Sequence, residues 1–114
     1  MLNYTNKIMM KENNKLIAEF MGYENVGTLS NPMYEYGERG GCRSLEDLCY
    51  HESWNWLMPV VQKIESLGYV FTIQGGKAEY GEMISETRCF IAEDKISSTY
   101  QAVVEFIKTY NNEE

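Results

Sequence analysis

The sequence is poor in the residues that build catalytic and metal sites, and it lacks long apolar runs. It has one histidine, two prolines and three cysteines among 114 residues. No stretch approaches the roughly 18 apolar residues of a membrane-spanning helix, and charges interrupt the first 21 positions, so we expect neither a membrane span nor a signal peptide. An odd number of cysteines without an export signal favours reduced thiols and a cytoplasmic location.

Basic residues are scarce relative to acidic ones. The chain has 10 Lys and Arg against 17 Asp and Glu, a formal net charge of −7. An acidic surface repels phosphates, so we expect no direct nucleic-acid binding and no anionic membrane as partner. The acidic residues are spread along the chain, which favours a charge that keeps a soluble domain dispersed. The alternative is a surface that docks on a basic partner or imitates a nucleic-acid backbone.

The length fits a single domain over residues 1–114. A chain of this size buries about two thirds of its surface on folding, enough for a core without disulfides. Its 44% hydrophobic content argues against wholesale disorder. Residues 1–10 show no hydrophobic period, so we expect them to be frayed.

Hydrophobic periodicity predicts three helices. The first is short, with Asn13 or Asn14 as its cap and Gly22 at its end. The second and third have clearer apolar stripes and begin after the caps Ser53 and Asp94. The three stripes comprise Leu16, Ile17, Phe20 and Met21; Trp54, Leu57, Met58, Val61 and Ile64; and Ile96, Tyr100, Val103, Val104 and Ile107.

Three strands are predicted between the second and third helices. Residues alternate with a period of two over 69–74, 77–84 and 87–92. Gly75 and Gly76 suit a tight hairpin turn, because both can adopt positive φ. The predicted fold class is α+β: a small three-stranded antiparallel sheet with two amphipathic helices packed on one face, plus a short N-terminal helix and a long irregular loop, in the order α-loop-α-β-β-β-α.

The long irregular segment at 23–50 supplies the candidate ligand-binding residues. Structureless segments of this length are uncommon in compact domains and are often functional. Arg39 and Arg43 flank glycines and supply forked donors that match phosphate or carboxylate, and Tyr34 and Tyr36 have rings that can stack on a base. We therefore consider a nucleotide-like ligand here. The segment lacks the Lys-Ser/Thr end of a P-loop, and a plain mobile loop is the alternative.

The metal and thiol candidates are Cys42, Cys49 and His51. Their C-x6-C-x-H spacing is longer than the usual zinc pairs, and Cys89 would have to complete the set. Cys49 or Cys89 with His51 is the conceivable nucleophile pair, but no glycine motif for an oxyanion follows a strand. We therefore predict no metal, no cofactor, no catalytic residues and no enzyme.

Trp54 and Trp56 are the candidate interface residues. They project roughly 200° apart on an ideal helix, so both cannot lie at the centre of one stripe. We expect one in the core and the other partly exposed, either beneath the long segment or at a contact between subunits. Self-association is therefore among the expected properties.

Three segments carry a resemblance to a known group of proteins: NNKLIAEFMGY at 13–23, SWNWLMPVVQKIESLGY at 53–69 and KISSTYQAVVEFIKTYN at 95–111. They resemble short, largely uncharacterised bacteriophage and prophage proteins, especially of gut Bacteroidetes, which we associate with the phage α-β-α sandwich type of domain. The segment at 24–50 is longer than in that pattern. The resemblance implies a phage accessory protein in the host cytoplasm, and it implies no mechanism.

Three functional hypotheses follow. The first is a non-enzymatic phage-type accessory protein that acts by stoichiometric binding and inhibits a host protein, such as a defence component. The second is a small-ligand binder that sequesters a nucleotide-like signal through Tyr34, Tyr36, Arg39 and Arg43. The third is a small enzyme, which would require a tightly held metal or a reactive thiol of low pKa.

Overall fold

The computed structural model describes residues 4–23, 27, 33–36, 41–44, 48–82 and 87–112. The chain divides into two compact units, Met1–Cys49 and Tyr50–Glu114, and each is described by itself. The single domain expected over 1–114 stays a prediction, because this division does not test whether either unit folds alone.

In the first unit, helix α1 begins earlier than the sequence indicates. It spans Tyr4–Phe20, so residues 4–10, predicted to be frayed, are helical, and Asn13 and Asn14 are not caps. Asn14 lies buried inside the helix, and its side-chain amide donates a hydrogen bond to the carbonyl of Leu48 at 3.0 Å. The early turns contain Met and Lys, which favour helix, but they form no apolar stripe that a periodicity argument can detect.

The segment at 23–50 contains a two-stranded antiparallel hairpin that the sequence did not predict. Strand β1 (Met33–Tyr36) pairs with strand β2 (Gly41–Ser44). Each strand has four residues, too few for an alternation of apolar and polar positions to stand out. The expected long irregular loop is therefore interrupted by regular structure.

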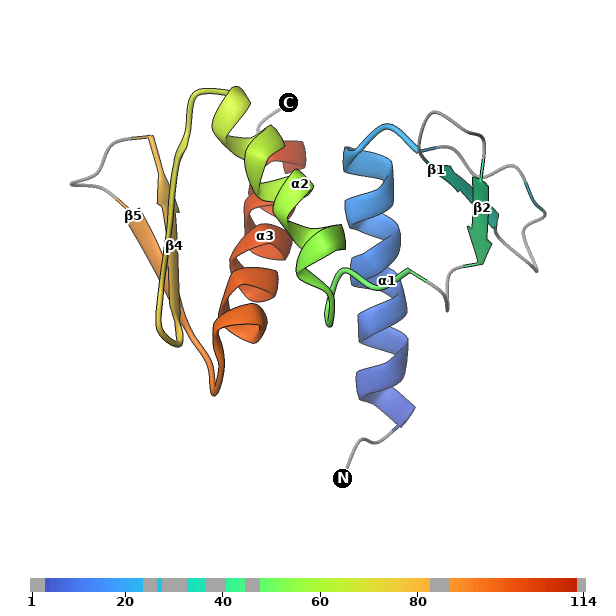
Figure 1. Ribbon diagram of the computed structural model, residues 1–114, viewed down its shortest axis with the longest axis horizontal. Coiled ribbons are helices and arrows are strands. Elements are labelled where there is room, and N and C mark those ends of the chain that lie inside the picture. Colours follow the sequence, from blue (N-terminus) through green and yellow to red (C-terminus); the bar gives the residue numbers. More distant parts are fainter. Residues whose placement is uncertain are drawn as a thin grey trace. The chain divides into compact units, whose positions relative to one another are not determined.

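The second unit is a three-stranded antiparallel sheet with two helices on one face (Figure 1). Its elements are α2 (Trp54–Ser66), β3 (Val70–Gln74), β4 (Lys77–Gly81), β5 (Thr87–Ile91) and α3 (Lys95–Asn112). The strands are ordered β3-β4-β5, each antiparallel to its neighbour. The predicted α+β fold class, with this order of helices and strands, is confirmed.

The helix ends agree with the sequence in most respects. Gly22 follows α1 with φ of 87°, and Gly68 follows α2 with φ of 99°. The carboxylate of Asp94 accepts a hydrogen bond from the backbone N–H of Ser97 at 2.8 Å and caps α3. Ser53 occupies the N-cap position of α2, but its side chain makes no capping hydrogen bond.

The core of this unit lies between the sheet and its two helices. The covered face of the sheet presents Phe71, Tyr80 and Arg88 in one cross-strand row and Ile73, Ala78 and Phe90 in the next. Helix α3 contacts all three strands and α2, so it buries a wider face than its predicted stripe. The additional buried residues are Ser98, Thr99, Ala102 and Phe106.

The β3–β4 hairpin needs its two glycines for different reasons. Gly75 adopts a φ of 59°, which side chains disfavour. Gly76 does not lie in that region; instead, a Cβ atom added to it would lie 2.6 Å from the carbonyl oxygen of Ala92. The N–H of Ala92 donates to the carbonyl of Gly76 at 2.9 Å, which holds these backbones close together.

None of the helices in the described part of the chain combines the length and apolar character needed to cross a membrane.

Candidate functional site

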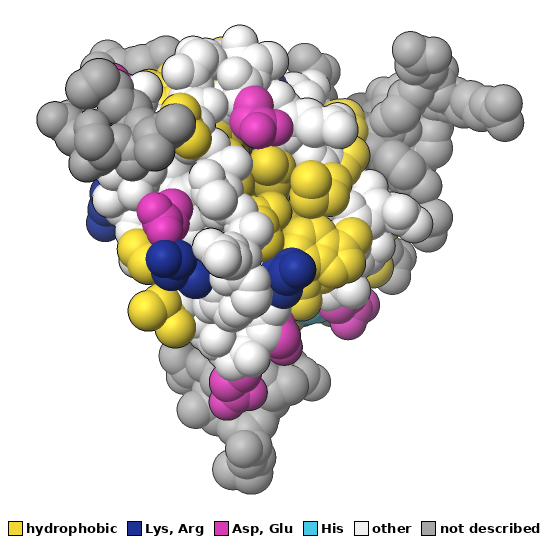
Figure 2. Space-filling view, turned by 60° about the vertical axis from the view of Figure 1, so that its left-hand side comes forward, with side chains coloured by type: hydrophobic (Ala, Val, Ile, Leu, Met, Phe, Trp, Pro, Cys, Tyr) yellow, Lys and Arg dark blue, Asp and Glu magenta, His cyan; other side chains and the backbone are white. Residues whose placement is uncertain are grey.

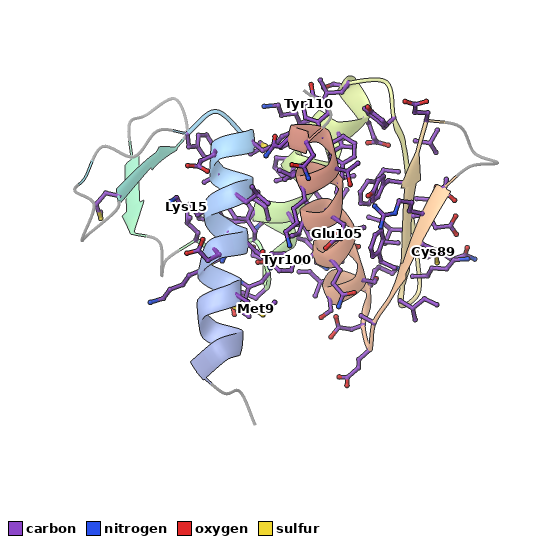
Figure 3. All side chains as sticks on the ribbon, turned by 180° about the vertical axis from the view of Figure 1, so that it is seen from behind. Met9, Lys15, Cys89, Tyr100, Glu105 and Tyr110 are labelled. Carbon is purple, nitrogen blue, oxygen red and sulfur yellow. The ribbon has the colours of Figure 1, made fainter. Side chains whose placement is uncertain are left out.

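An arginine-aromatic pocket of about 230 Å³ opens where the C-terminal half of α3 meets the sheet of the second unit. The four aromatic residues of its wall are Tyr69, Tyr80, Phe106 and Tyr110, and its polar side chains are those of Glu82, Arg88 and Thr109. Tyr110 lies near the C-terminal end of α3 (Figure 3). Strands and helix therefore contribute jointly to one concave surface.

The aromatic wall is organised around Phe106, which is only 2% exposed. Its ring centroid lies 4.8 Å from that of Tyr69 and 5.4 Å from that of Tyr80, both nearly perpendicular to it. Tyr110 stacks on it at 5.6 Å with an interplanar angle of 17°. These are the offset and edge-to-face arrangements that aromatic rings prefer, so each ring restrains its neighbours. The wall is a preformed apolar surface.

Arg88 is oriented by neutral groups. It lies opposite Tyr80 in the β4–β5 register, and its Nη1 donates to the hydroxyl oxygen of Tyr80 at 3.1 Å. The same nitrogen makes a longer hydrogen bond, of 3.4 Å, to the hydroxyl oxygen of Thr109 on α3. The guanidinium carbon also lies 5.5 Å from the ring centroid of Phe90. These contacts hold the guanidinium beside the aromatic wall.

The charge of Arg88 is not neutralised by the part of the chain that the structure describes. No carboxylate in the described ranges forms an ion pair with it, and its side chain is exposed. Glu82 also lines the pocket, with an exposed side chain. A guanidinium fork binds carboxylate or phosphate oxygens in pairs. The pocket can therefore hold a planar group on its wall and a negative charge at Arg88.

The uncovered face of the same sheet is electrostatically different. Nζ of Lys77 lies 2.9 Å from a carboxylate oxygen of Glu79, whose other oxygen accepts a hydrogen bond from the hydroxyl of Thr87 at 2.6 Å. The Thr87 hydrogen bond, followed by that of Lys77, lowers the pKa of Glu79, and Glu79 in turn raises the pKa of Lys77. In Figure 2, side chains of both charges are interspersed on the visible surface. On the uncovered face Lys77 therefore has a carboxylate partner, whereas Arg88 has none among the described residues.

The side chains of the ligand-binding residues proposed from sequence fall outside the described part of the structure. Tyr34 and Tyr36 lie in β1 and Arg43 lies in β2, where the pairing places Tyr34 opposite Arg43. Arg39 and the side chains of the other three are outside the described part of the structure. This hypothesis stays a prediction.

Among the cysteine and histidine candidates, Cys89 and His51 lie on opposite sides of the sheet. Cys89 is exposed on the uncovered face of the sheet, whereas the ring of His51 lies 6.1 Å from that of Tyr100 on α3, on the covered side. Cys49 is half-buried, and the side chain of Cys42 is not among those described. Within the described residues, no three His, Cys, Asp or Glu side chains converge as metal ligands would.

Both tryptophans of α2 are half-buried, so the expectation that one lies in the core is wrong. The ring of Trp56 meets that of Tyr50 edge-on at 5.3 Å. The buried residues of α2 begin only at Leu57, so the first turn, which contains Trp54 and Trp56, lies at the margin of the packed face.

Sequence reasoning missed the arginine-aromatic pocket, although it contained one signal for it. The period of two over 87–92 implies that Arg88 and Phe90 share one strand face and Cys89 lies on the other, and the structure has this division. A charged residue on the face that packs against helices is unusual and points to a functional role. The convergence of Phe106 and Thr109 on that arginine depends on tertiary packing.

Comparisons with protein-family models, with curated proteins and with solved structures find no match to this chain. The phage-protein resemblance therefore stays a prediction.

Proposed function

We propose that this chain acts by stoichiometric binding and that its arginine-aromatic pocket holds a small planar ligand with a negative charge, such as a nucleotide. The observation that supports this is the Arg88 guanidinium, which is exposed, is oriented by two neutral hydroxyls and has no ion-pair partner among the described residues. A ring packs on the aromatic wall while a phosphate or carboxylate accepts from the guanidinium.

The pocket volume restricts the ligand further. At about 230 Å³, it is smaller than the roughly 300–1,000 Å³ of typical sites for drug-sized molecules. One ring system with one attached anionic group fits this space better than a dinucleotide. This proposal keeps the nucleotide-like ligand class expected from sequence but assigns it to different residues.

The biological setting we propose is the one expected from sequence, a phage-type accessory protein. That part of the proposal rests on the resemblance of residues 13–23, 53–69 and 95–111. Sequestering a small signal and blocking a protein are alternative routes to such a role. The narrow pocket favours the first route, because it accommodates a single ring and not a broad protein surface.

Isothermal titration calorimetry tests the binding activity. The panel comprises nucleoside monophosphates, the corresponding nucleosides and inorganic phosphate. We expect saturable 1:1 binding of at least one monophosphate, with its nucleoside at least about tenfold weaker. Arg88→Gln should weaken binding of that monophosphate to the level of its nucleoside, whereas Lys77→Gln, an equal loss of charge on the uncovered face, should leave it unchanged. Absence of binding across the panel, or equal binding by the Arg88→Gln variant, contradicts the proposal.

A further inference from the structure

Strand β5 forms one edge of the three-stranded sheet. It pairs with β4 over five consecutive residues without a bulge, and no other strand in the described part of the chain pairs with its second side. Cys89 is exposed, and Ile91 is 74% exposed, the largest value among the exposed large hydrophobic side chains. Figure 3 shows Cys89 on the side of β5 that faces away from α3.

The backbone of β5 alternates between bonding to β4 and pointing outward. The N–H of Ala92 donates to the carbonyl of Gly76 at 2.9 Å, so this position bonds inward. Because antiparallel bonding alternates along a strand, Phe90 and Arg88 also bond to β4. The N–H and C=O groups of Thr87, Cys89 and Ile91 then point away from the sheet, available to another strand.

This edge lacks the features by which sheet edges usually avoid pairing. It contains no proline and no lysine, and its one charged residue, Arg88, has its side chain on the covered face. At the opposite edge, the outward-pointing positions are Phe71, which is buried, and Ile73, which is half-buried. At β5, by contrast, the side chains of the outward-pointing residues lie on the uncovered face, where Cys89 and Ile91 are exposed.

We infer that β5 pairs with β5 of a second copy of this chain, antiparallel and centred on Cys89, so that two sheets become continuous. This register engages all three outward-pointing residues of each copy. It places Thr87 opposite Ile91 of the other copy, a pair of β-branched residues, and Arg88 opposite Phe90. A shift that centres the pairing on Arg88 would instead set two arginines side by side. Charge and hydrogen bonding thus select the same register.

The net charge sets the expected salt dependence. Each chain carries −7, so two copies repel one another at low ionic strength, and added salt screens this repulsion. The dimer should therefore strengthen with salt, opposite to an interface held by surface ion pairs.

Cysteine cross-linking reports the register directly. In this register the two Cys89 residues form a hydrogen-bonded pair, whose Cα atoms lie about 5.5 Å apart, and this distance is within the range that a disulfide spans. In a Cys42→Ser, Cys49→Ser background, mild oxidation should yield a covalent dimer linked through Cys89. Light scattering after size exclusion should show a mass that rises from monomer to dimer with concentration. A monomer at all concentrations, or an unlinked dimer after oxidation, overturns the inference.

Two variants separate edge pairing from loss of fold. Ile91→Lys places a charge on the edge and should weaken dimerisation at least about tenfold, while Gln74→Lys on β3, also exposed, should leave it unchanged. Cys89→Pro removes an outward N–H that does not bond to β4, so circular dichroism should remain native while the dimer is lost. A dimer that both edge variants leave intact uses another surface and contradicts the proposed pairing.

Discussion

Arg88 donates a hydrogen bond to the hydroxyl of Tyr80, its cross-strand partner, at 3.1 Å. Tyr80 is 5% exposed, whereas the Arg88 side chain is exposed. The pair therefore joins the packed core to a charge that reaches solvent. The buried ring of Tyr80 fixes where its hydroxyl lies, and the hydrogen bond to that hydroxyl orients the guanidinium of Arg88.

Tyr80→Phe should separate the effect of the orientation of the Arg88 guanidinium from the effect of its charge. The ring and its packing remain, but the acceptor for Arg88 is lost, so we expect the free energy of unfolding to fall by about 1 kcal/mol. Ligand binding should weaken, though less than in Arg88→Gln, because the charge is retained. Urea denaturation and calorimetry measure the two effects, with Tyr23→Phe in the other unit as the control. Wild-type stability and affinity in Tyr80→Phe would show that this hydrogen bond does not position Arg88.

Gly76→Ala should destabilise the protein. Its new Cβ would lie 2.6 Å from the carbonyl oxygen of Ala92. This backbone atom cannot move without disturbing the hydrogen bond from the N–H of Ala92 to the carbonyl of Gly76. Overpacking of this kind costs about 1–3 kcal/mol, measurable by urea denaturation. Gln74→Ala, at an exposed position of the same hairpin, is the control and should change stability by less than about 0.5 kcal/mol. Equal effects at both positions would contradict the close-approach explanation.

Asp94 should contribute pH-dependent stability. Hydrogen bonds from the backbone and then the side chain of Ser97 lower the pKa of Asp94 below its ordinary value of 3.8. A lowered pKa means that the contribution is present above that ordinary value and disappears as the pH falls through the folded-state value. Asp94→Ala should therefore lower Tm by about a few degrees at pH 7 and by progressively less below pH 3.8. Glu93→Ala is the control, and a Tm difference that is constant with pH would contradict the capping role.

Pro59→Ala should stabilise α2. Pro59 lies inside the helix with an exposed side chain, and it cannot donate to the carbonyl of Asn55. Restoring that hydrogen bond outweighs the smaller entropic benefit of proline in the unfolded chain, so we expect a gain of about 1–2 kcal/mol. Gln62→Ala, at an exposed site of the same helix, should change stability little. A less stable Pro59→Ala protein would show that the native conformation of α2 requires the proline, which would contradict this prediction.

The sequence predicts most of the second unit because local signals there agree with tertiary packing. Alternation located all three strands, and Asp94 correctly marks the start of α3. Periodicity underestimates the buried face of α3, since a helix that packs on both a sheet and another helix buries residues such as Ser98 beyond one stripe. The early turns of α1 and the β1–β2 hairpin lack such signals, and the sequence misses both.

The candidate site is less accessible to sequence reasoning than the fold. Alternation assigns Arg88 to one face of its strand, but Phe106 and Thr109 of α3 meet it only through tertiary packing, with Thr109 lying 21 residues further along the chain. Glycine-rich composition directed attention to Arg39 and Arg43 instead, which no described side-chain contact tests.

The coupling between Arg88 and the ligand's negative charge tests the central claim most directly. It requires four dissociation constants: those of the best-binding nucleoside monophosphate and its nucleoside, each on the wild-type protein and on Arg88→Gln. If the guanidinium recognises the anion, removing the phosphate should cost at least about tenfold on the wild type and almost nothing on the variant. An equal loss on both proteins would show that Arg88 does not bind the charge, and the arginine-aromatic pocket would lose its assigned role.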